Sequence, residues 1–127
     1  MNSSYVVAKF GGTSVADFDA MSRCAQIIQN NSQVRLVAVS ASAGVTNHLV
    51  ALCQNDLTQL ERNKHITQVC DIQNSILKNI TLESDLADGF SQTLNQFKAL
   101  AENENSIEKN KDALLSFGER LSSYLFT

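Results

Sequence analysis

Two short runs of strand-forming residues, separated by one helical segment, constrain the fold of this chain more than any other feature. The first run, from Tyr5 to Phe10, is β-branched and aromatic and stops at Gly11-Gly12, and the second extends from Val34 to Val39. Between them, apolar residues from Val15 to Ile28 recur at steps of three and four, which is typical of an amphipathic helix. The order strand, helix, strand predicts two parallel strands with a right-handed crossover, the repeating unit of α/β folds.

Polar residues ahead of the helical segments predict where those helices begin. Ser14 fits a helix N-cap, because Asp17 three positions later can accept from free backbone N–H groups. The run Asn30-Asn31-Ser32 supplies a stop for this first helix. Thr46 could cap a second helix that carries Leu49 and the apolar residues after it.

Beyond Thr46 we find no further strand-like run, and the remaining sequence is helical in character. The last helix stops at Phe126-Thr127 without the Gly, Asn or basic turn that commonly closes a helix, an ending that we interpret as interrupted. Three apolar stripes at helical spacing define the helices: Ile66, Val69, Cys70, Gln73, Ile76, Leu77 and Ile80; Leu86, Phe90, Leu94, Phe97 and Leu100 or Ala101; and Leu114, Leu115, Phe117, Leu121 and Leu125.

Two parallel strands offer too little surface to order this many helices, because a parallel sheet is normally covered on both faces. Further strands could come from sequence outside this chain or from another copy of it. Alternatively, the helices could pack mainly on one another. The sequence leaves these three possibilities open.

Length and composition favour a single globular unit. The chain has 127 residues, of which 43% are hydrophobic and 18% charged, with a formal net charge of -3 from intermixed acids and bases. This charge argues against nucleic acid as a partner, and the lack of a run of roughly 20 apolar residues argues against a membrane partner and favours a cytoplasmic location. Cys24, Cys53 and Cys70 are interpreted as reduced thiols of the core.

The turn after the first strand combines a cation with glycine. In Lys9-Phe10-Gly11-Gly12-Thr13-Ser14, a lysine ends a strand and two glycines precede hydroxyl residues. Glycine lets backbone N–H groups approach an oxyanion, and a lysine can neutralise charge on a transferring phosphoryl group. The alternative is a strand-to-helix turn that needs glycine for its backbone angles and has a surface lysine nearby. Taken alone, the glycine pair favours that second interpretation.

The turn after the second strand is rich in small and hydroxyl residues. It extends from Ser40 to Asn47 and follows the strand at its carboxyl end, where open α/β sheets gather their ligands. The side chains of Ser40, Ser42, Thr46 and Asn47 could donate hydrogen bonds to a carboxylate or phosphate. Helix capping by Ser and Thr explains the same residues equally simply.

Together, K-F-G-G-T-S-V at Lys9 to Val15 and S-A-S-A-G-V-T-N at Ser40 to Asn47 resemble the opening motifs of the aspartokinases, in particular the monofunctional lysine-sensitive type. S-F-G-E-R-L-S at Ser116 to Ser122 is similar to that family's glycine-glutamate-leucine-serine helix. The resemblance implies an incomplete three-layer, carbamate-kinase-like α/β fold of the amino-acid kinases, with two parallel strands followed by a mainly helical region. Residues 1–127 would be the amino-terminal part of the catalytic domain, without the rest of that domain or the regulatory domains.

The same resemblance implies a role for particular residues. Lys9 would be catalytic and bind ATP together with Gly11 and Gly12, by stabilising the transferring phosphoryl group. Ser40 and Thr46 would contact aspartate. Glu119 would bind the α-ammonium group of that substrate, although a solvated glutamate on a helix face is the plain alternative.

The reaction that the family implies transfers the γ-phosphate of ATP, bound with Mg²⁺, to the β-carboxylate of L-aspartate. It opens lysine, threonine and methionine biosynthesis, in an enzyme that would be a homo-oligomer under feedback control. The arginine, the aspartate and the adenine site that the family carries later in its chain are not found here, so we expect these 127 residues alone to be inactive. No metal ligands are assigned, and His48 and His65 match no catalytic position.

Two other interpretations remain. The chain could belong to a bifunctional aspartokinase fused to a homoserine dehydrogenase, whose kinase half opens in nearly the same way. It could instead be a non-enzymatic helical interaction module that keeps a vestigial phosphate turn.

Overall fold

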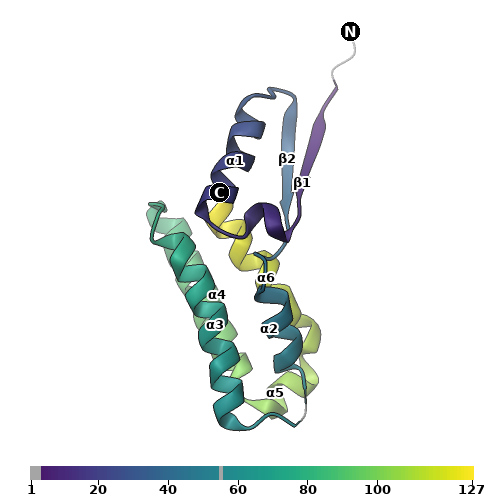
Figure 1. Cartoon of the computed structure of the whole chain (residues 1–127), viewed down its shortest axis with the longest axis vertical. Helices are drawn as coiled ribbons and strands as arrows, with labels where there is room; N and C mark the ends of the chain where they lie inside the picture. The colour runs from purple at the N-terminus through teal and green to yellow at the C-terminus, as the bar shows by residue number, and fades with distance from the viewer. Residues whose placement is uncertain (1–3, 55) are drawn as a thin grey trace.

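The computed structural model describes residues 4–54 and 56–127, which form two strands followed by a mainly helical region (Figure 1). This order agrees with the predicted strand, helix, strand opening. The elements are β1 (Val6–Phe10), the short 3-10 turn η1 (Gly12–Val15), α1 (Phe18–Gln29), β2 (Val34–Val39), α2 (Val45–Leu52), α3 (Gln59–Leu77), α4 (Ser84–Ala101), α5 (Glu104–Lys109) and α6 (Lys111–Phe126).

The two strands pair in parallel, as the sequence predicts. Val7 lies opposite Leu36, and Lys9 lies opposite Ala38. Helix α1 connects the strands and ends at Gln29, with Asn30 as its C-cap, so the predicted stop is confirmed. The carboxyl ends of both strands therefore lie side by side, and the turns that follow them are neighbours.

The predicted starts of the first two helices are wrong. Ser14 lies inside η1, and α1 is capped by Asp17, whose Oδ1 accepts a hydrogen bond from the backbone N–H of Ala20 at 2.8 Å. Helix α2 begins at Val45, before Thr46, and its N-cap is Gly44 with φ of +91°. Left-handed backbone of this kind favours glycine, so backbone geometry rather than a threonine hydroxyl sets the start of α2.

Two features of the helical region were not predicted. The six-residue helix α5 is too short to show an apolar repeat, and Ile107 is its buried apolar residue. Helix α3 begins with a capping box, in which Thr58 accepts from the N–H of Glu61 and the Glu61 carboxylate accepts from the N–H of Thr58. These two bonds satisfy backbone donors that would otherwise have no partner in the first turn.

The sheet is covered on one face only among the described residues. Phe10 and Val39 pack against the main core, and the ring of Phe126 at the end of α6 lies 5.9 Å from that of Phe10. On the opposite face, Val7 is 63% exposed and Leu36 is 61% exposed. Two strands thus contribute little to the core, as the sequence suggests.

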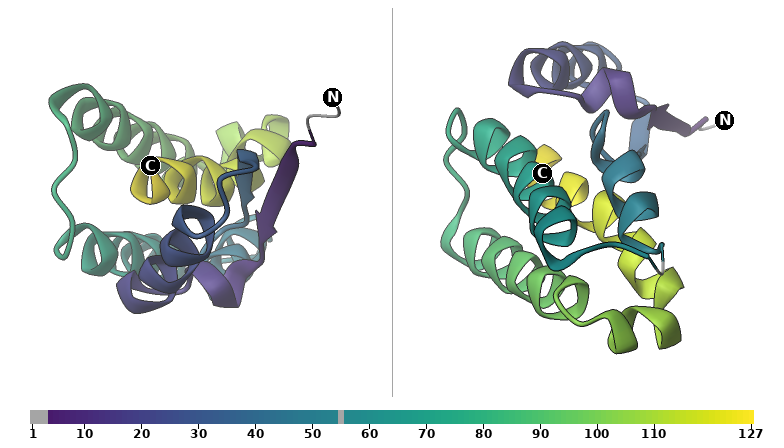
Figure 2. Two further views of the ribbon diagram at one scale, coloured as in Figure 1. Left: turned by 90° about the horizontal axis from the view of Figure 1, so that it is seen from above. Right: turned by 60° about the horizontal axis from the view of Figure 1, so that its bottom comes forward.

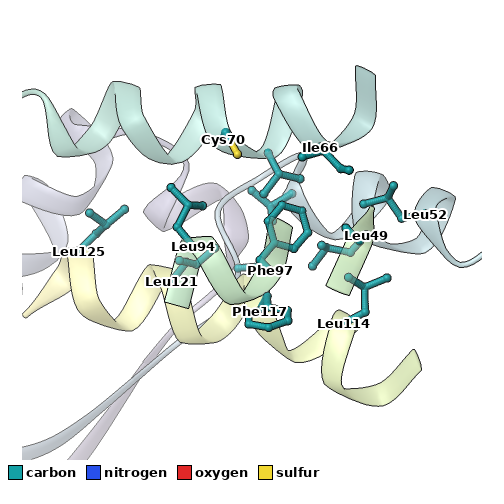
Figure 3. Close-up of a cluster of buried hydrophobic side chains, with 14 of the residues drawn as sticks. Leu49, Leu52, Ile66, Cys70, Leu94, Phe97, Leu114, Phe117, Leu121 and Leu125 are labelled. Atoms are coloured by element: carbon teal, nitrogen blue, oxygen red, sulfur yellow. The ribbon is translucent and has the colours of Figure 1, made fainter. Parts of the chain in front are cut away.

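Among the described residues the helices pack mainly on one another, as in the third of the possibilities that the sequence leaves open. Helix α6 runs beside α4, contacts α2 and α3, and reaches back to the strands (Figures 1 and 2). The core that they enclose is drawn in Figure 3, which labels Leu49, Leu52, Ile66, Cys70, Leu94, Phe97, Leu114, Phe117, Leu121 and Leu125.

The three cysteines are free thiols, as expected. Burial raises the pKa of Cys24, Cys53 and Cys70 above the usual thiol value, which keeps each one protonated. None of the described helices combines the length and the apolar composition that crossing a bilayer requires.

Replacing Phe97 with alanine tests the interhelical core. Phe97 is fully buried on α4 and packs edge to face on Phe117 of α6, with ring centroids 5.7 Å apart. We expect Phe97→Ala to lower the free energy of unfolding by about 3–5 kcal/mol, measured by urea denaturation. Leu60→Ala, at a side chain that is 69% exposed on α3, is the control and should change it by less than about 0.5 kcal/mol. Equal effects of the two substitutions would contradict this core.

Candidate functional site

Three segments that are far apart in the sequence meet at Ala41, in the turn after β2. A Cβ atom placed on Gly12 would stand 2.9 Å from the carbonyl oxygen of Ala41. One placed on Gly118, in the middle of α6, would stand 2.5 Å from the Cβ of Ala41. The glycine turn, the small-residue turn and the segment around Glu119 are therefore brought together.

Backbone hydrogen bonds hold the two turns against each other. The N–H of Ser40 donates to the carbonyl of Phe10 at 3.0 Å, and the N–H of Ala43 donates to the carbonyl of Gly12 at 3.1 Å. These bonds tie the turn after β2 to the end of β1 and to η1. Ser40 takes part in the first bond and Lys9 directly precedes Phe10, so the backbones of both residues lie next to this junction.

The glycine turn does not need glycine for its backbone angles. Among the described residues, Gly44 is the one with positive φ, and Gly11 has an ordinary φ of -76°. Gly12 is required for space, because of Ala41, but a Cβ on Gly11 would meet no atom within 4 Å. The alternative interpretation, in which the glycines are needed for their backbone angles, is therefore wrong. The open space beside Gly11 is where a ligand could approach the backbone.

Lys9 and Glu119 both present their charges to solvent. Lys9 is exposed on β1, on the same face of the sheet as Val7. Glu119 is exposed on α6, one residue after the buried Gly118. Both charged groups are therefore accessible from solvent.

The hydroxyl residues of the second turn separate into two groups. Ser40 is half-buried, and Thr46 and Asn47 are exposed in the first turn of α2. Ser42 is 1% exposed, so its side chain does not face solvent as those of Thr46 and Asn47 do. Its Oγ is buried without a hydrogen-bond partner, because the turn directs this side chain into the core.

A family model confirms the relationship that these motifs indicate. The model described as the amino acid kinase family matches residues 4–127. The chain belongs to the amino acid kinase family. The predicted fold class is confirmed as well, since a crystal structure of Escherichia coli aspartokinase III with aspartate and ADP superposes with a TM-score of 0.84, at 41% identity over 96% of this chain.

Similar members of the amino acid kinase family include two bacterial proteins. Lysine-sensitive aspartokinase 3 of Escherichia coli (strain K12) is 42% identical over 126 residues, which are 98% of this chain and 28% of that protein. "Putative inactive aspartokinase 3" of Haemophilus influenzae is 51% identical over 74 residues, which are 58% of this chain and 60% of that protein. This chain thus spans about a quarter of the length of the Escherichia coli relative, and the Haemophilus relative is itself short.

One side-chain pair, His48 with His65, was not predicted from the sequence. The Nδ1 atoms of His48 on α2 and His65 on α3 lie 2.9 Å apart, so the N–H of one ring donates a hydrogen bond to the Nδ1 of the other. Both rings are half-buried, with centroids 5.2 Å apart. Burial, and then the charge of His65, lower the pKa of His48 below the ordinary 6.5. The two histidines are 17 positions apart, so no short sequence motif indicates the pair.

The lowered pKa of His48 predicts acid-sensitive stability. Below pH 6.5 the unfolded chain binds a proton at His48 more readily than the folded chain does. The free energy of unfolding is therefore highest, as far as His48 is concerned, above pH 6.5, and it falls as the pH drops below that value. Urea denaturation between pH 5 and pH 8 measures this slope. His48→Asn keeps an amide in place of Nδ1 but does not titrate, so its slope should be shallower. Identical slopes in both proteins would remove His48 from this role.

Proposed function

We propose that this chain supplies the aspartate pocket and the phosphate turn of an aspartate kinase, which makes 4-phospho-L-aspartate from L-aspartate and ATP. The observation that carries the proposal is the meeting of the three motifs at Ala41, because each motif alone has an ordinary structural explanation. The Escherichia coli structure similar to this chain contains aspartate and ADP, which supports both ligand classes. The lysine-sensitive relative favours the monofunctional type over the bifunctional one.

The phosphate end of the proposed site consists of Lys9 and the glycine turn. The carbonyl of Gly11 accepts from Ser14 and that of Gly12 accepts from Ala43, so N–H groups are what the glycines can present to nucleotide phosphates. The ammonium of Lys9 would balance charge on the transferring phosphoryl group. The open space beside Gly11 suits this approach.

The aspartate end consists of Ser40, Thr46 and Glu119. The two hydroxyls can donate to carboxylate oxygens, and the carboxylate of Glu119 can accept from the α-ammonium group. This division of charge would orient the amino acid, with its β-carboxylate toward Lys9. Two anions must be held together in this reaction, so positioning and charge balance are the main tasks of the protein.

Phosphoryl transfer then proceeds in line. A β-carboxylate oxygen attacks the γ-phosphorus as the bond to the β,γ-bridging oxygen breaks, which yields the acyl phosphate and ADP. Mg²⁺ would enter with ATP and offset phosphate charge, since Mg²⁺ is often bound through substrate phosphates. Within residues 4–54 and 56–127, no three His, Cys, Asp or Glu side chains gather as metal ligands.

The cellular setting follows from the same proposal. The relative is lysine-sensitive by name, and one of its crystal structures contains lysine with aspartate. We propose a cytoplasmic biosynthetic role in the pathway to lysine, threonine and methionine, and a homo-oligomeric complete enzyme under feedback control. No residue of this chain is assigned to the effector.

The 127-residue chain by itself should show no aspartate kinase activity. Its junction holds the aspartate-facing groups and Lys9, but the chain spans 28% of the Escherichia coli relative. A coupled assay of ADP release should show no aspartate-dependent rate above background. A rate that depends on aspartate would show that these residues form a complete catalyst.

A chimera tests the proposed function directly. We would replace the matching 126 residues of the Escherichia coli enzyme with this chain and measure aspartate-dependent ADP release. The chimera should be active, and Lys9→Ala should lower kcat by about 10²–10³-fold through loss of charge stabilisation. Lys64→Ala, at an exposed lysine on α3, is the control and should leave kcat unchanged. A chimera that is folded by circular dichroism yet inactive would contradict the proposal.

A further inference from the structure

The closest approach at the junction involves Gly118. This glycine is buried in the interior of α6, where glycine costs about 0.5–1 kcal/mol of helix stability relative to alanine. A Cβ at this position would stand 2.5 Å from the Cβ of Ala41, and 3.4 and 3.5 Å from side-chain atoms of Leu49 and Val45. Ordinary contacts begin at 3.4 Å, so a methyl group here demands a shift of nearly 1 Å against Ala41 alone.

Ala41 is not free to make that shift. Its carbonyl oxygen lies close to Gly12, 2.9 Å from where a Cβ on that residue would stand. The hydrogen bonds from Ser40 to Phe10 and from Ala43 to Gly12 fix the residues on either side of it. Added bulk at Gly118 therefore displaces α6, together with Glu119, rather than the turn.

We propose that Gly118 and Ala41 are a size-matched pair that positions Glu119 against the aspartate-facing turn. This proposal rests on the proposed function, because it assigns Glu119 an ammonium group to bind. Gly118 is a positioning residue and touches no substrate itself. A displacement of about 1 Å exceeds the tolerance of a charge-assisted hydrogen bond, and misplacement on that scale can cost as much as about 10²-fold in rate.

Exchanging the two residues tests the pair in the chimera. Gly118→Ala should raise KM for aspartate at least about tenfold, with KM for ATP changed less than about twofold, because the displaced group faces the amino acid. Adding Ala41→Gly removes the opposing methyl group and should bring KM for aspartate back to within about threefold of the parent. Ala41→Gly alone reports the cost of the second change.

A matched glycine elsewhere supplies the control. A Cβ on Gly89 of α4 would stand 2.6 Å from the ring of Tyr124 on α6, so Gly89→Ala adds a methyl group beside α6 without touching Ala41, and the end of a side chain can turn aside. It should change the unfolding midpoint less than Gly118→Ala does and leave KM for aspartate within about twofold. Equal changes in KM from Gly89→Ala and Gly118→Ala would reduce Gly118 to a general packing residue and overturn the proposal.

The 127-residue chain provides a second measurement that needs no activity. Gly118→Ala should lower its thermal midpoint, and Ala41→Gly should raise the midpoint again in that background only. If Ala41→Gly rescues neither the midpoint nor KM, the pairing of Gly118 with Ala41 is wrong. The proposed function still stands in that case, provided that the parent chimera is active. A folded but inactive parent chimera removes both the proposed function and the positioning role, although the midpoints still show whether the two residues touch.

Discussion

The apolar side of α6 is the surface on which the rest of the structure depends. Leu114 and Leu121 are fully buried, and Phe117 and Leu125 are each 4% exposed. Along its length, this helix packs in turn on α2, α4 and the end of the sheet, so it joins the helices to the strands. Each fully buried leucine or phenylalanine contributes on the order of 1.5–3 kcal/mol. The two strands alone could not supply a comparable core.

A buried arginine closes the other end of the helical region. Arg62 of α3 is 2% exposed, and its Nη1 donates to the carbonyls of Leu52 at 3.3 Å and Ala101 at 3.4 Å. These are the last residues of α2 and α4. The C-terminus of a helix carries about half a negative charge, so two converging helix ends balance roughly one guanidinium charge. Arg62 thereby fixes the far end of α2, the helix that begins at the proposed aspartate turn.

Local signals predicted the strands and failed at the helix starts, for a physical reason. The bounds of β2 were predicted to the residue, because a strand-forming run ends sharply at small residues. Ser14 and Thr46 were chosen as caps on their hydroxyls, but a 3-10 turn and the left-handed Gly44 decided those positions. The contact of Ala41 with Gly118 joins distant segments, so the sequence shows the glycine without its partner. The site residues followed from resemblance, whereas their meeting point required the fold.

The position of Lys9 on the sheet bears on the role proposed for its charge. Lys9 and Val7 lie on the uncovered face of the sheet, where water reaches the lysine. In water a unit charge 4 Å from an oxyanion contributes about 1 kcal/mol, against about 4 kcal/mol at an effective dielectric constant near 20. Parallel sheets are normally covered on both faces. Covering this face would therefore bury the exposed side of the sheet and strengthen the charge stabilisation proposed for Lys9.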